Sequence, residues 1–169
     1  MPDTPARAIV AGIVPGQPSA VVRYAARLAA TFGVPLECAY VDVSSYAIST
    51  NIDGSILAVP IDPDGATDAA EETAVAIEQY LRRELAGAGI DWRVHLLAGN
   101  ASRELERLAD EVDAELIVVG TRERGVLAGL AEFLSGSIAA QLSHRQCRPV
   151  VVVPLQPAAD GEALPWDEP

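Results

Sequence analysis

Residues 115–139 read ELIVVGTRERGVLAGLAEFLSGSIA, and this stretch decides the expected fold. Leu116–Val119 is a short, wholly apolar run, which is typical of a central strand in a parallel sheet. A glycine-rich connection follows it, and the spacing of Leu134, Ile138 and Leu142 then predicts a helix. A buried strand, a glycine-rich turn and a helix in this order indicate a unit of an α/β domain.

The same alternation of short β-branched runs and amphipathic helical patterns extends over the rest of the chain. We expect strands at residues 8–14, 36–43, 92–97, 116–119 and 149–154, with a helix between each successive pair. The first helix ends at Gly33, the second follows an Asp68-x-x-Glu71 capping box, and Asn100 caps the third. The expected fold is an α/β open sheet of five parallel strands with helices on both faces.

The alternation predicts a single domain over residues 1–155, and two segments of the chain depart from it. Residues 44–65 are long for a strand-to-helix connection, and Tyr46–Thr50 and Ile56–Ile61 flank a turn-like Asn51–Gly54, which suggests an inserted β-hairpin or flap. Residues 156–169 are rich in proline and acidic side chains, so we expect a disordered tail, although its Leu164 and Trp166 can dock on a surface.

The charge of the chain restricts its partners. The net charge is −12, from 24 acidic and 12 basic residues, which argues against general binding of nucleic acid or of anionic lipid. We find no apolar stretch long enough to span a membrane and expect no secretory signal. Cys38 and Cys147 lie in separate apolar segments without metal-ligand spacing, so we expect both to be reduced and structural in a cytoplasmic protein.

An acidic protein that binds an anion must do so locally, and the opening stretch has suitable groups. Backbone amides of Gly136, Ser137 and Ile138 are candidate donors at a helix N-terminus, where the partial charge is positive. Arg122 and Arg124 lie in the connection before them. The alternative interpretation is that Ser135 only caps the helix and the glycines only form turns.

The combination of motifs resembles the universal stress protein family. The resemblance rests on Ile117–Arg122, the later Gly136-Ser137 and the closing Cys147–Pro154, together with Ile9–Ile13 and Ala39–Asp42 near the start. It covers about residues 7–154, and the order and spacing of the motifs agree as well as their composition.

This resemblance implies the strand order 3-2-1-4-5 and a site for ATP, with or without Mg²⁺. By position, the Val41 backbone would face adenine, Gly120 would lie near the ribose, and Arg122 beside the phosphates. Gly136, Ser137 and Ile138 would hold the phosphates. The candidate nucleotide-binding residues are therefore Val41, Gly120, Thr121, Arg122, Gly125, Gly136, Ser137 and Ile138.

Two positions depart from the family pattern. Nucleotide-binding members usually have an Asp at the end of the first strand, where this chain has Val14, which cannot accept a hydrogen bond. The second glycine of the loop signature aligns with Glu123, whose carboxylate would repel phosphate, and Gly125 is the candidate replacement with shifted spacing.

We expect a binding and signalling module without catalytic or metal residues, and at most slow ATP hydrolysis. His95 and His144 are isolated in sequence from nucleophiles and metal partners, so we expect them at the surface or near a helix end. The four valines Val150–Val153 would form an exposed sheet edge, which in the related family commonly pairs with a second copy, so we expect a twofold homodimer. The alternatives are a member that binds no nucleotide and acts through protein contacts, or an enzyme for another nucleotide-like ligand with the 44–65 insertion as a lid.

Overall fold

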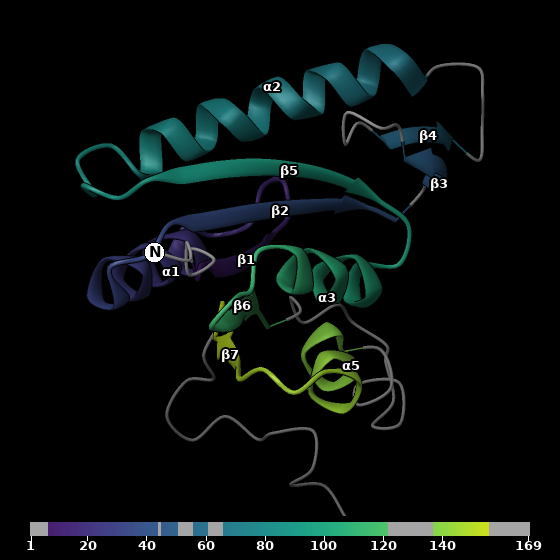
Figure 1. The fold of residues 1–169 in the computed structure, drawn as a ribbon. Coiled ribbons are helices and arrows are strands. Elements are labelled where there is room, and N and C mark those ends of the chain that lie inside the picture. The colour runs from purple at the N-terminus through teal and green to yellow at the C-terminus, as the bar shows by residue number, and fades with distance from the viewer. Residues whose placement is uncertain (1–6, 44, 51–55, 61–65, 122–136, 156–169) are drawn as a thin grey trace, which may run out of the picture.

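The computed structural model describes residues 7–43, 45–50, 56–60, 66–121 and 137–155 (Figure 1). Its main element is a five-stranded parallel sheet in the order β5-β2-β1-β6-β7. The strands are β1 (Ile9–Ile13), β2 (Leu36–Asp42), β5 (Trp92–Ala98), β6 (Leu116–Gly120) and β7 (Val150–Val153). In terms of the five strands expected from the sequence, this is the order 3-2-1-4-5, so the predicted fold class is confirmed.

Helices cover both faces of the sheet. The elements α1 (Ala20–Phe32) and α2 (Ala66–Glu84) pack on one face, and α3 (Ala101–Glu111) and α5 (Ile138–Arg145) pack on the other. Alternate residues of one strand enter opposite cores, so that Ile9 packs on the α1 side and Val10 on the α3 side. Because β1 is apolar on both faces, it is buried at the centre of the sheet, as expected for a parallel strand.

Two helix ends lie where the sequence places them. Gly33 ends α1 in the left-handed conformation with φ 69°, and its N–H bonds to carbonyls of the last turn. The side chain of Asn100 accepts a hydrogen bond from the Arg103 N–H at the start of α3. The capping box predicted at Asp68-x-x-Glu71 does not lie at a helix start. The helix α2 already begins at Ala66, so Asp68 lies inside its first turn.

The 44–65 region contains an antiparallel pair of strands, β3 (Ser45–Thr50) and β4 (Ile56–Pro60), which form a separate two-stranded sheet. The two strands contact β5, so the pair lies at that edge of the main sheet. Among the described residues, no helix is long and apolar enough to cross a membrane.

The two cysteines have different environments. Cys38 is fully buried in β2, and this burial raises its pKa to about 12, so its thiol is inert at neutral pH. Cys147 is exposed, so its side chain lies outside the core.

Candidate functional site

The candidate site lies where β1 and β6 stop pairing, and we call this place the crevice. These two strands pair only from Ile9 opposite Leu116 to Ala11 opposite Val118, although each continues for two further residues. Both strands keep their other neighbours in that region, since Ile13 pairs with Tyr40 of β2 and Gly120 with Val153 of β7. The chain leaves β1 toward α1 on one face and reaches α5 on the opposite face after β6. This is the point of reversed strand order at which open α/β sheets bind ligands.

The loop after β1 forms one side of the crevice. Val14 is 58% exposed and offers no polar group, as the sequence indicated. The backbone N–H of Gln17 donates to the Val14 carbonyl at 3.2 Å, which closes a turn through Gly16 at φ 78°. The side-chain Nε2 of Gln17 is buried and has no hydrogen-bond partner in the described part of the chain. Sequence reasoning missed this donor, because a glutamine in a polar loop is ordinarily solvated.

The N-terminus of α5 forms the other side. Ser137 is its N-cap, and the Ser137 Oγ accepts a hydrogen bond from the Ala140 N–H at 3.4 Å. The cap is therefore Ser137 and not Ser135, and the helix begins at Ile138, two residues later than a Ser135 cap implies. The first-turn N–H groups of Ile138 and Ala139 have no acceptor within the helix. The Ser137 hydroxyl keeps its own hydrogen, which can donate to an anion.

A buried hydroxyl links α5 to the start of α3. The Oγ of Ser102 lies 2.7 Å from the Asn100 Oδ1 and 2.8 Å from the Gln141 Oε1. Because a hydroxyl has one hydrogen, it donates fully to one of these oxygens at a time. The link joins the N-cap of α3, which directly follows β5, to the first turns of α5. Two helix N-termini with partial positive charge are thus neighbours at the carboxyl end of the sheet.

Gly120 and Thr121 have structural partners at the same end. A Cβ atom built on Gly120 would lie 3.0 Å from the Leu155 Cδ1 and 3.1 Å from the Val21 Cγ2. The Thr121 Oγ1 accepts a hydrogen bond from the Leu155 N–H at 2.9 Å, and the Thr121 N–H donates to the Val153 carbonyl at 2.9 Å. The glycine is therefore required for close packing of Leu155, whatever its relation to a ligand.

Val41 lies where its main chain can face the crevice. β1 ends at Ile13 opposite Tyr40, so β2 extends past it by Val41 and Asp42. On its other side Val41 pairs with Leu97 of β5. The edge of β2 that faces β1 is thus no longer covered by a strand at Val41.

Five of the eight residues predicted from the resemblance lie in the described chain, all at this end of the sheet. They are Val41, Gly120, Thr121, Ser137 and Ile138. The other three, Arg122, Gly125 and Gly136, lie outside the described residues, as does Glu123.

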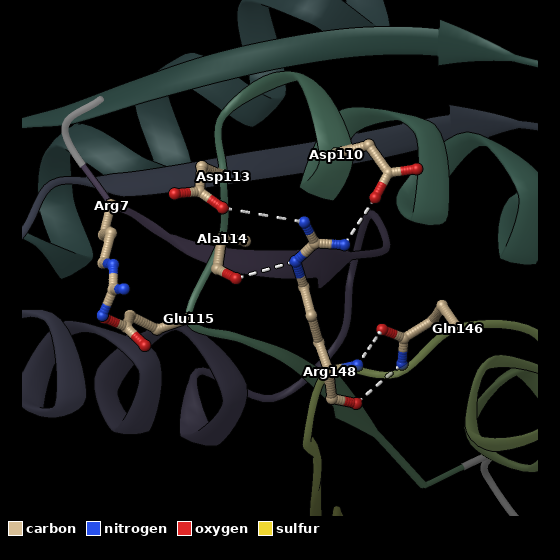
Figure 2. A network of polar contacts seen from close by, with 7 residues as sticks. All are labelled: Arg7, Asp110, Asp113, Ala114, Glu115, Gln146 and Arg148. Atoms are coloured by element: carbon tan, nitrogen blue, oxygen red, sulfur yellow. Dashed lines mark hydrogen bonds and ion pairs between the residues drawn. The ribbon is translucent and has the colours of Figure 1, made fainter. Parts of the chain in front are cut away.

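The opposite end of the sheet has paired charges (Figure 2). Arg148, just before β7, donates through Nε to the Ala114 carbonyl at 2.8 Å and pairs with the Asp110 carboxylate. The amide of Gln146 exchanges two hydrogen bonds with the Arg148 backbone, at 2.6 and 2.8 Å. Arg7 pairs with Glu115 at 2.7 Å.

One buried carboxylate lies near this amino end, in the second residue of β2. Glu37 is 1% exposed, and its two oxygens contact the Arg93 guanidinium at 3.0 Å and the His95 Nε2 at 2.7 Å. The hydrogen bond with His95, assisted by the charge of Arg93, holds the pKa of Glu37 below its usual value despite burial. His95 is therefore not isolated, contrary to the sequence-based expectation, because strand pairing brings β5 beside β2.

Comparison with known families agrees with this architecture. The model of the universal stress protein family matches residues 6–154. The chain belongs to the universal stress protein family. No curated protein matches it in a sequence search.

Solved structures of universal stress proteins share the fold. One from Archaeoglobus fulgidus is 22% identical with a TM-score of 0.61, over 86% of this chain and 97% of that one. One from Burkholderia pseudomallei is 23% identical with a TM-score of 0.62, over 90% and 99% of the two chains. A third, determined in complex with cAMP, is 23% identical with a TM-score of 0.60, over 90% and 100%.

Proposed function

We propose that this universal stress protein binds an adenine nucleotide, with ATP as the expected ligand, in the crevice between β1 and β6 and acts as a stress-response or signalling module. The observation that supports it most strongly is that β1 and β6 stop pairing after Ala11 opposite Val118. The next described element along the chain after β6 is α5, whose N-terminus offers free N–H groups. Structural neighbours were determined with cAMP and, in an A. fulgidus protein with a TM-score of 0.53, with dAMP.

The phosphate end of the ligand is assigned to α5. The free N–H groups of Ile138 and Ala139 and the Ser137 hydroxyl would donate to phosphate oxygens, and the helix dipole adds partial positive charge. Such a local site is compatible with a net charge of −12, because it needs no basic surface. Within the described residues, no three His, Cys, Asp or Glu side chains are grouped to hold a metal, so any Mg²⁺ would depend mainly on the phosphates.

The nucleoside end is assigned to the β1 side of the crevice. The uncovered main chain of Val41 would face adenine, and the buried Nε2 of Gln17 would donate to a ligand oxygen or nitrogen. Gln17 thus takes the place of the polar contact that Val14 cannot make. Gly120 and Thr121 hold Leu155 against the end of β6, beside this part of the site.

The test uses two substitutions at the N-cap of α5. Asp and Asn are both favoured N-caps, so Ser137→Asp and Ser137→Asn should both preserve the helix, but only Asp adds a negative charge beside the phosphates. We expect Ser137→Asp to weaken nucleotide binding by about 10-fold or more, since about 1.4 kcal/mol of repulsion is tenfold in Kd. Ser137→Asn removes the hydroxyl but keeps an N–H donor and adds no charge, so it should bind clearly more tightly than Ser137→Asp.

The measurement is titration calorimetry with ATP, ADP and AMP, with and without Mg²⁺, on protein stripped of co-purifying ligand. Equal affinity of the two variants would place the phosphates elsewhere. Absence of heat with the unsubstituted protein at high micromolar nucleotide would remove the nucleotide proposal and leave the alternative of a protein-contact module. Exposed Val14, in place of an acceptor, is the feature that favours this alternative.

Self-association is a second part of the proposal. β7 is an edge strand of the main sheet, and its Val152 is 45% exposed. An apolar parallel-sheet edge can pair with a twofold copy of itself, so we propose a homodimer through β7. Light scattering should give twice the 17.7 kDa chain mass at micromolar concentration, and Val152→Lys should shift it toward one chain. A single-chain mass for the unsubstituted protein would contradict the dimer.

A further inference from the structure

One side of α1 presents an apolar row that the described residues cover only in part. Tyr24, Leu28 and Phe32 lie four residues apart, which places them on one face of the helix. Tyr24 is 38% exposed and Phe32 is 51% exposed. The Arg27 guanidinium lies 4.8 Å from the Tyr24 ring centroid. We call Tyr24, Arg27, Leu28 and Phe32 the α1 flank.

The α1 flank lies on the side of the helix that faces β7. Leu28 is seven residues, or two turns, after Val21, so the two side chains lie in one row. Val21 and Leu155 both approach the α-carbon of Gly120, within 3.1 Å of the position that a Cβ would occupy. The helix contacts both β6 and β7. The row therefore begins beside the residue at which the described chain ends.

The charge of α1 is unusual for this protein. The helix contains Arg23 and Arg27 and no acidic residue, in a chain with a net charge of −12. Arg23, one turn before Arg27, pairs with Glu84 of α2 at 2.9 Å. Arg27 has no carboxylate partner in the part of the chain that the structure describes.

We propose that the C-terminal segment of the same chain, residues 156–169, packs along the α1 flank. Leu164 and Trp166 cover Tyr24, Leu28 and Phe32, and the neighbouring carboxylates surround Arg27. The segment reads QPAADGEALPWDEP, with four acidic residues and no basic residue, and its only large apolar side chains are this leucine and this tryptophan. Its composition is thus complementary to the α1 flank in both charge and apolarity.

The attachment point and the length of the segment fit this placement. Leu155 is held by its N–H bond to the Thr121 Oγ1 and by packing over Gly120, on the same side of the sheet as α1. Leu164 follows nine residues later and can reach about 30 Å from Leu155 when extended. The helix is only about 20 Å long, so the segment spans it without strain. Attachment also gives the segment a millimolar effective concentration, so weak contacts suffice. The proposal does not depend on nucleotide binding.

The test follows Trp166 directly. The chain has two tryptophans, so Trp92→Phe leaves Trp166 as the sole emitter. In this background, acrylamide quenching of Trp166 is compared with that of a free peptide of residues 156–169. We expect clear protection in the full chain. Arg27→Glu should lower the docking constant about fivefold, because a charge contact at the surface contributes up to about 1 kcal/mol, and quenching should rise toward the peptide value.

A matched charge reversal gives the control. Arg82 lies on α2, is 69% exposed and lines a shallow groove between α2 and β5. Arg82→Glu should leave the quenching of Trp166 unchanged. Protection lost in Arg82→Glu but not in Arg27→Glu would place the segment in that groove and overturn the proposal. If Trp166 in the Trp92→Phe protein without further substitutions is quenched as strongly as in the free peptide, the segment is not docked at all.

Mixing distinguishes the chain's own segment from that of a second copy. Both chains in this experiment carry Trp92→Phe. The first keeps Trp166 and has Arg27→Glu, and it is mixed with an excess of the second, which has Trp166→Phe and an unchanged α1. Quenching should remain high if the segment docks on its own chain. Recovery of protection would show that it docks on a partner copy and would contradict the proposal as stated.

Discussion

The two ends of the sheet differ in how their polar groups are satisfied. At the amino end, the Arg148 and Arg7 side chains have carboxylate or carbonyl partners (Figure 2). The buried Glu37 carboxylate is also paired there, with Arg93 and His95. At the carboxyl end, the first N–H groups of α5 and the Gln17 Nε2 are hydrogen-bond donors without an acceptor among the described residues. This difference supports the proposal that the amino end stabilises the fold and that the carboxyl end binds the ligand.

Helix polarity explains part of this difference. In an α/β fold, helices begin near the carboxyl ends of the strands and end near the amino ends. A cation is favoured near a helix C-terminus, and Arg148 donates to the Ala114 carbonyl just after α3. An anion is favoured near a helix N-terminus, where α3 and α5 are linked through Ser102. Three substitution experiments can break or sharpen the comparison.

The largest effect is expected at Glu37. The double substitution Arg93→Ala with His95→Ala leaves this buried carboxylate without its two side-chain hydrogen-bond partners, and we expect the free energy of unfolding at pH 7 to fall by about 3 kcal/mol. Urea unfolding measures it. As a control, Arg82→Ala removes an exposed pair with Glu78 and should cost less than about 0.5 kcal/mol.

The same experiment has a pH dependence. In the unsubstituted protein the folded pKa of Glu37 is lowered, so its contribution is present above the ordinary pKa of 4.5 and is lost as pH falls through the folded value. In the double variant, burial alone disfavours the carboxylate, so protonation relieves the defect. The difference in stability between the two proteins should shrink from pH 7 to pH 4. A constant difference would show that lost packing, not charge, accounts for it.

A smaller loss is expected at Arg148. Its side chain is only 18% exposed, and Arg148→Met keeps the apolar stem but removes the bonds to Ala114 and Asp110. We expect the free energy of unfolding to fall by about 2 kcal/mol. Arg7→Met should change stability much less, because the Arg7–Glu115 pair is solvated. Nucleotide affinity should be unchanged in both variants, and a parallel loss of affinity would argue against separate roles for the two ends.

The smallest effect on stability is expected at Gln17. Gln17→Met removes a buried donor without a described partner, so unfolding should change by less than about 0.5 kcal/mol. Nucleotide affinity should fall about fivefold to tenfold, the value of one hydrogen bond. Gln146→Met makes the same change at the amino end, where both amide atoms are bonded, and should lower stability but not affinity. The opposite pattern in the two variants would reverse the assignment of the ends.

Local signals in the sequence predicted most of the fold. The 3.6-residue spacing located α1 and α3, Gly33 and Asn100 located two helix ends, and the apolar runs located the strands. The start of α5 was less certain, because Ser135 and Ser137 are equally good caps by residue type. The structure selects Ser137, whose oxygen accepts from Ala140.

Contacts between distant segments could not be predicted in the same way. His95 meets Glu37 across 58 residues of chain, and Arg148 meets Ala114 across 34. Gly120 was predicted as a ligand contact, yet the structure also shows it as the position over which Leu155 packs. Nothing in a single sequence distinguishes these roles, since a glycine can leave room for a ligand or for a side chain.

By itself, the sequence determined the alternation of elements and the family signature, because these depend on residue type and short-range spacing. Only the tertiary structure decided where β1 and β6 part, which donors are left without acceptors, and which charges are paired. Those properties depend on strand register and on the packing of helices against the sheet, which bring together atoms that are far apart along the chain.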